Sequence, residues 1–167
     1  MKKILSLILV SILLLSVVGC KAQGEDMPED FSFSLTWNVN GISSYDSKTG
    51  KLVKEDDATN ADDYTAYYQL TDEDKEYIYN LISELDIDSY PEKYDPKCGT
   101  SKPAMKLALT VNGNGKQKTV TAAGIGLQFT SEDAKGQAFL SACENIINRL
   151  TATEAWTALP EYEHLYD

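Results

Sequence analysis

Histidine, the most frequent catalytic base, occurs once in this sequence. The only histidine, His164, lies close to the C-terminal end of a 167-residue chain. A Ser–His–Asp or Cys–His arrangement would therefore require the terminal segment to fold back rigidly over the rest of the protein. Because chain ends are usually poorly ordered, we favour an exposed histidine. Paired carboxylates for glycoside hydrolysis cannot be chosen among 26 Asp and Glu residues without their geometry.

Two cysteines, Cys98 and Cys143, lie well inside the chain. No C-x-x-C or H-x-x-x-H spacing accompanies them, so a zinc site would require both to converge with His164 from distant segments. A disulfide between them is one interpretation, and it requires their Cα atoms to come within about 7 Å. Two free thiols, with Cys143 buried and inert, are the interpretation we favour. The sequence predicts no metal and no cofactor.

The densest acidic cluster consists of Asp56, Asp57, Asp62 and Asp63. A calcium loop of the EF type needs acids at alternate positions and a glycine at the sixth, and this cluster has neither, so we predict a solvated loop. The glycine-rich segments lack nucleotide-binding spacings and are interpreted as turns.

Aromatic residues are a second candidate for a binding surface. Tyrosines gather around the first predicted helix and could line a carbohydrate or peptide groove. The five candidates are Tyr67, Tyr68, Tyr79, Tyr90 and Tyr94. The alternative is that these side chains occupy ordinary half-buried strand and helix positions.

The first 20 residues have the three parts of an export signal. Lys2 and Lys3 precede an apolar stretch from Ile4 to Val18. As a helix this stretch would be about 22 Å long at ~1.5 Å per residue, which is shorter than the ~30 Å hydrocarbon core of a bilayer. The pattern therefore predicts a secretory signal.

Small residues and a cysteine end this segment, as Val-Val-Gly-Cys at positions 17–20. It resembles the lipobox of bacterial lipoproteins, which implies that the Cys20 thiol receives a diacylglyceryl group and that Cys20 becomes the first mature residue. Two acyl chains give stable membrane attachment. An ordinary secretory signal is the alternative. We thus expect a signal peptide at 1–19, a lipidated cysteine with a flexible tether at 20–30, and a domain at 31–167 on the extracytoplasmic face of the cell membrane.

The overall charge of the chain limits the classes of molecule that it can bind. The chain carries 26 acidic against 15 basic residues, a formal net charge of −11 with a pI near 4.5. Such a chain does not suit a nucleic acid, since a phosphate backbone needs a basic face. Anionic lipid headgroups should also repel the domain from the bilayer.

Apolar periodicity indicates the elements of the domain. Alternation from Phe31 to Trp37, a turn at Asn40-Gly41 and short segments up to Leu70 predict strands. Thr71 can cap a first amphipathic helix, and Ser131 a second. Between the helices we predict a hairpin over 104–111 and 116–121, after which the AAGIG segment at 122–126 loosens the chain.

Two one-sided helices and an antiparallel sheet predict an α+β fold, with two layers and both helices on one face of the sheet. Segments such as SSYDSKTGKLVK also resemble small bacterial surface lipoproteins, a resemblance that implies no activity. We therefore expect a membrane-anchored, non-enzymatic binding module whose partner is an envelope protein or a glycan. The alternative is an extracytoplasmic hydrolase with a carboxylate or metal-assisted site.

Overall fold

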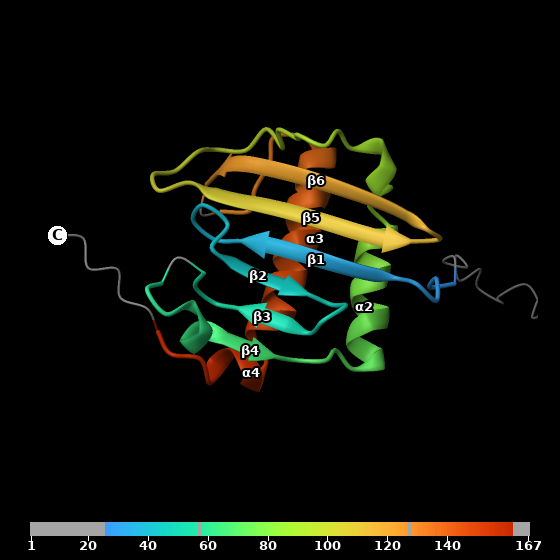
Figure 1. Cartoon of the computed structure of the whole chain (residues 1–167). Helices are drawn as coiled ribbons and strands as arrows, with labels where there is room; N and C mark the ends of the chain where they lie inside the picture. Colours follow the sequence, from blue (N-terminus) through green and yellow to red (C-terminus); the bar gives the residue numbers. More distant parts are fainter. Residues whose placement is uncertain (1–25, 57, 127, 162–167) are drawn as a thin grey trace, which may run out of the picture.

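The alternating segment that begins after Phe31 forms the first strand of a six-stranded antiparallel sheet, whose order is β4-β3-β2-β1-β5-β6 (Figure 1). The computed structural model describes residues 26–56, 58–126 and 128–161. The strands are β1 (Ser32–Trp37), β2 (Ser43–Asp46), β3 (Lys51–Val53), β4 (Thr65–Tyr67), β5 (Met105–Gly113) and β6 (Lys116–Ile125).

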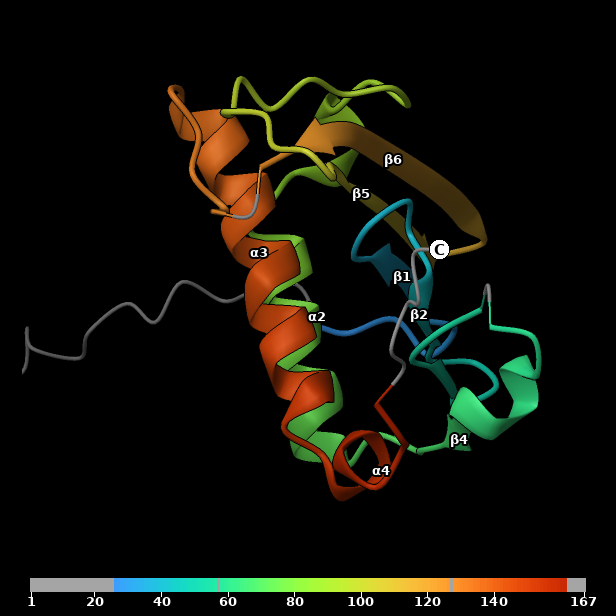
Figure 2. The ribbon, with the colours of Figure 1, turned by 90° about the vertical axis from the view of Figure 1, so that its left-hand side faces the viewer.

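The helices join the two parts of the sheet and cover one of its faces. The first four strands form a meander, α2 follows, and the β5–β6 hairpin then returns beside β1 before α3 begins. The helical elements are η1 (Ala61–Tyr64), α2 (Asp72–Ser83), η2 (Ile87–Ser89), α3 (Ala134–Thr151) and α4 (Glu154–Thr157). Figure 2 shows α2 and α3 side by side on the same side of the sheet. The predicted two-layer α+β architecture is confirmed.

The strand alternation separates the two faces of the sheet. On β1, Phe33, Leu35 and Trp37 are buried, whereas the residues between them are only half-buried. The buried set packs with the inner sides of α2 and α3, including Ile78 and Ile146. Neither α2 nor α3 lies on the opposite face of the sheet, and the short η1 lies on that side beside β4 (Figure 2).

The helix starts partly follow the sequence prediction. Thr71 caps α2 as expected, because its hydroxyl accepts a hydrogen bond from the backbone N–H of Asp74. The cap of α3 is instead Asp133, whose carboxylate accepts from the N–H of Gly136. The Ser131 hydroxyl donates to the Pro96 carbonyl, so the prediction of a Ser131 cap is wrong.

The end of the hairpin also differs from the prediction. β6 continues to Ile125 instead of loosening after residue 121, because Ala122 and Ile125 are buried and paired with β5. Gly124 permits this with a φ of 76°, which a larger residue would adopt less readily. In the described part of the chain, no helix is long and apolar enough to cross a bilayer.

Candidate functional site

A wide groove lies at the end of the sheet where the chain enters β1. It measures about 1100 Å³ and lies between the β2–β3 turn and the β5–β6 turn. One rim is the segment from Met27 to Asp30, and the walls include side chains from β1, β5 and the start of α2. This volume lies just above the ~300–1,000 Å³ that is typical of sites for small organic ligands.

The N-terminal rim of the groove is fixed to the β5–β6 turn. The Asp30 carboxylate accepts hydrogen bonds from the backbone N–H groups of Asn114 and Gly115, each 2.7 Å long. These two bonds lower the pKa of Asp30, since they favour its charged form. The Phe31 ring packs edge-on against Tyr79 of α2, with 5.0 Å between centroids. Residues 26–30, assigned to the tether from the sequence, thus include a stretch that contacts the domain.

The opposite rim is a β2–β3 turn held by local hydrogen bonds. One oxygen of the Asp46 carboxylate accepts from the N–H groups of Lys48 and Thr49, both at 2.9 Å. The Ser47 hydroxyl accepts from the N–H of Phe33 at 2.7 Å, which attaches the turn to β1. Both rims are therefore positioned before any ligand arrives.

Hydroxyl groups line the open sheet face next to the groove. The strand register places Ser34 of β1 opposite Asp46 of β2 on one side and Thr110 of β5 on the other. Thr110 in turn lies opposite Thr119 of β6, and their hydroxyl oxygens are 2.8 Å apart. Directly paired residues point to the same face, so these side chains form one polar row across four strands.

Some charged side chains of the groove have a hydrogen-bond or ion-pair partner, and others have none among the described residues. The carboxylates of Asp30 and Asp46 are engaged by the turns, and Lys75 lies 3.8 Å from Asp72. Lys48 and Lys116 are exposed, one on each turn, and have no ion pair or hydrogen bond from their side chains within the described residues. Glu29 on the N-terminal rim is also exposed and unpaired within the described residues, so the groove lining includes two unpaired lysines and one unpaired acid.

The most elaborate polar network of the structure lies outside the groove, between α2 and α3. Asp74 is buried, and its carboxylate accepts from the hydroxyls of Thr71 (2.8 Å) and Tyr68 (3.0 Å) and from Nε of Arg149. Burial raises the pKa of Asp74, but these bonds outweigh it and hold the pKa below its usual value. The hydrogen bonds to the Asp74 carboxylate join parts of the domain to one another. We therefore assign this network a role in the stability of the fold.

The five candidate tyrosines do not form a single surface. Tyr67 is 74% exposed at the β4 edge, whereas Tyr68 contacts Asp74. Tyr79 contacts the N-terminal segment. Tyr90 is buried, with its hydroxyl donating to the Lys135 carbonyl, and it packs edge-on against Tyr94. The structure thus distributes these residues over separate contacts, and among them only Tyr79 approaches the groove region through Phe31.

The other candidate residues from the sequence are the cysteines, the acidic cluster and the histidine. Cys98 is half-buried and Cys143 fully buried, and both are free thiols. Burial raises the pKa of Cys143. Asp56 is exposed, and its neighbour Asp57, like Cys20 and His164, lies outside the described residues. Within the ranges that are described, no three His, Cys, Asp or Glu side chains come close enough together to hold a metal ion.

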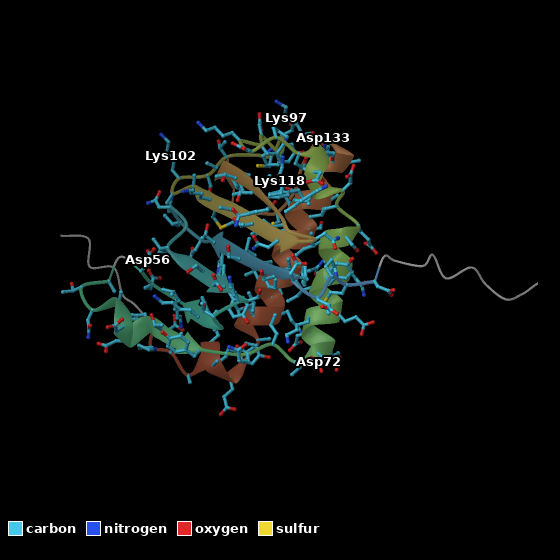
Figure 3. The ribbon with its side chains drawn as sticks, turned by 45° about the vertical axis from the view of Figure 1, so that its right-hand side comes forward. Asp56, Asp72, Lys97, Lys102, Lys118 and Asp133 are labelled. Carbon is cyan, nitrogen blue, oxygen red and sulfur yellow. The ribbon has the colours of Figure 1, made fainter. Side chains whose placement is uncertain are left out.

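Charged residues of both signs lie on the β5–β6 side of the molecule (Figure 3). Figure 3 shows Lys97, Lys102 and Lys118 around the β5–β6 side, with Asp133 beside Lys97, and Asp56 and Asp72 toward the β4 side. The lysines are partly compensated, since Lys97 forms an ion pair with Asp95. The groove, whose lining includes Lys48 and Lys116, lies at one end of the sheet.

Sequence reasoning did not identify the groove residues. Ser34, Thr110, Lys48 and Lys116 are ordinary strand and turn residues by type, and only the pairing of β1 with β5 brings them together. The one available signal was the alternation of hydroxyl and apolar residues in β1, which predicted a polar outer face. Comparison with protein-family models and with curated proteins finds no match to this chain.

Proposed function

We propose that this chain is a lipid-anchored protein on the extracytoplasmic face of the cell membrane, and that its domain is a non-enzymatic binding module. The anchor rests on the sequence of residues 1–20, which resembles a lipobox. The binding role rests on the groove of about 1100 Å³, whose rims are fixed by hydrogen bonds and whose walls continue into a polar sheet face that neither α2 nor α3 covers.

The chemistry of the carboxyl groups supports binding over hydrolysis. A carboxyl group that acts as a general acid needs a raised pKa. Burial in an apolar environment or a nearby negative charge is the usual cause. Among the described residues, the shifted carboxyl groups are Asp30, Asp74 and Asp95, and each has a lowered pKa. Each is charged in the neutral range and engaged in local hydrogen bonds, which suits a structural role.

Membrane fractionation tests the anchor. We expect the wild-type protein in the membrane fraction, and we expect Cys20→Ala to remain uncleaved or to be released. Cys98→Ala is the matched control, since it removes a thiol without touching the lipobox. Membrane retention of a cleaved, correctly sized Cys20→Ala protein would contradict the anchor.

Affinity capture tests the binding role. The detergent-solubilised protein is incubated with envelope material, and a Thr110→Tyr variant is compared with it, because a large ring at Thr110 fills the groove wall. Ala123→Tyr is the control, since it adds the same ring to an exposed β6 position outside the groove. We expect the wild type and the control to capture the same component and Thr110→Tyr to lose it. Equal capture by all three would contradict a role for the groove.

A further inference from the structure

We infer that the groove binds an extended polysaccharide strand that carries sparse negative charges, such as one carboxylate for every two sugars. This inference rests on the proposed binding function and specifies its ligand class. It follows from the polar row across the four strands, from the side chains of the groove walls and from the position of two lysines.

The first observation is the spacing of the polar row. Asp46, Ser34, Thr110 and Thr119 are directly paired across four neighbouring strands. Neighbouring strands lie about 4.8 Å apart, which is close to the length of one sugar residue in an extended, β-linked chain. A glycan that crosses the strands can thus meet one polar side chain per sugar.

The second observation is the kind of polar group present. Hydroxyl and amide side chains both donate and accept, as sugar hydroxyls do. The groove contains several such neutral groups, among them Ser34, Thr110, Asn112, Gln117 and Gln69. Thr110 and Thr119 use a single O–H donor between them, so the other donor and the spare lone pairs remain free to bind a ligand.

The third observation is an apolar wall. Phe31 and Pro28 line the groove beside the neutral polar groups. The C–H faces of pyranose rings can pack on such a surface while their hydroxyls reach the polar row. An amphipathic wall of this kind suits sugars better than a small inorganic anion.

The fourth observation is charge complementarity. Among the acids that line the groove, Asp30 and Asp46 accept from backbone N–H groups and Glu29 is unpaired within the described residues. Lys48 and Lys116 are both unpaired there, so the groove lining has two unpaired lysines and one unpaired acid. Two carboxylates on one glycan segment would pair with the two lysines. The net charge of −11 repels a dense polyanion, so the ligand that fits is sparsely charged.

Binding of defined oligosaccharides to the full-length protein in detergent micelles tests this inference. The probes are a hyaluronan octasaccharide, which is β-linked with one carboxylate per disaccharide, a neutral β-1,4-linked N-acetylglucosamine hexamer, and maltohexaose, which is α-linked and coiled. Calorimetry gives the affinities. We expect the carboxylated probe to bind most tightly, the neutral β-linked probe more weakly, and maltohexaose not at all.

Paired variants localise the site. Lys48→Ala/Lys116→Ala should weaken binding of the carboxylated probe about three- to tenfold and leave the neutral probe unaffected, since exposed ion pairs contribute modestly. Lys93→Ala/Lys102→Ala removes two exposed lysines outside the groove and should change neither affinity. Ser34→Ala/Thr110→Val should weaken both β-linked probes, and circular dichroism verifies that it folds.

The outcomes separate the two proposals. Equal affinity for all three probes, no binding of either β-linked probe, or equal losses in both lysine pairs would overturn the glycan inference. If affinity capture then still retains an envelope protein through Thr110, the binding function stands and only the ligand class is wrong. If capture also fails, the proposed binding function falls with it.

Discussion

Nε of Arg149 on α3 donates a hydrogen bond to the carboxylate of Asp74 on α2, which joins the end of one helix to the beginning of the other. Asp74 is buried while the Arg149 side chain is 43% exposed. Asp74 is also the shared acceptor of this network, since the hydroxyls of Thr71 and Tyr68 donate to the same carboxylate. Because α2 and α3 together cover the sheet, this contact fixes the layer that supports the groove from behind.

Replacement of Asp74 should destabilise the protein more than replacement of Arg149. Asp74→Ala leaves the Tyr68 and Thr71 hydroxyls and the guanidinium without their acceptor, and we expect a loss of about 2–3 kcal/mol in the free energy of unfolding. Arg149→Ala should cost less, since Thr71 and Tyr68 still satisfy the carboxylate. Urea unfolding measures both, and equal losses would contradict the assigned asymmetry.

Acid should weaken the same contact. The folded-state pKa of Asp74 lies below its unfolded value, so its contribution is fully present above the unfolded pKa, about 4, and is lost as the pH falls through the folded pKa. The difference in unfolding free energy between wild type and Asp74→Asn should shrink as the pH falls below about 4. A constant difference over that range would show that the charge of Asp74 contributes nothing.

Gly136 should not tolerate alanine although it lies in a helix. Glycine to alanine usually stabilises a helix interior by about 1 kcal/mol. At Gly136, however, an added Cβ would overlap the Pro96 carbonyl oxygen and the Ser131 hydroxyl. We expect Gly136→Ala to lower the melting temperature, whereas an exposed α3 position such as Asn145→Ala should not. A raised melting temperature for Gly136→Ala would contradict the close packing of the 96–98 loop on α3.

The two internal thiols should react at very different rates. Cys98 is half-buried in a loop, while Cys143 is fully buried with a raised pKa, so little reactive thiolate forms there. A thiol reagent added to the folded Cys20→Ala protein should modify Cys98 and reach Cys143 only after denaturation. Peptide mapping identifies the modified residue. Rapid modification of Cys143 in the folded state would contradict its burial, and a mass two protons lower would indicate a disulfide.

The Asp30 contact should control the order of the N-terminal rim. Asp30→Ala removes the acceptor for Asn114 and Gly115, so the amides of the β5–β6 turn should exchange their hydrogens faster. Glu29→Ala is the control, since the described structure gives that side chain no hydrogen bond or ion pair. Equal exchange in both variants would show that Asp30 does not fix the rim.

The sequence predicted much of the fold because local patterns determine it. Phe33, Leu35 and Trp37 alternate strictly, and the Thr71 cap precedes a clear apolar stripe, so β1 and α2 could be located from the residues alone. The α3 cap could not, since both Ser131 and Asp133 are suitable residues. In the structure the Ser131 hydroxyl donates to the Pro96 carbonyl, 35 positions earlier in the chain, and accepts from the N–H of Asp133, while the Asp133 carboxylate accepts from the N–H of Gly136.

The groove was beyond sequence reasoning for a similar reason. Its rims meet only because β5 returns beside β1, which pairs Ser34 with Thr110 over a separation that no local pattern encodes. The tyrosines are a second case in which contacts distant in the sequence decide the placement. Their clustering in the sequence suggested one surface, but Tyr90 points into the core and Tyr67 to solvent.

Mass spectrometry of the intact protein purified from its native membranes tests the central claim most directly. We predict a chain that begins at Cys20 and carries the added mass of a diacylglyceryl group on that residue. A chain that begins at another residue, or one with an unmodified Cys20, would contradict the account of a lipid-anchored binding module.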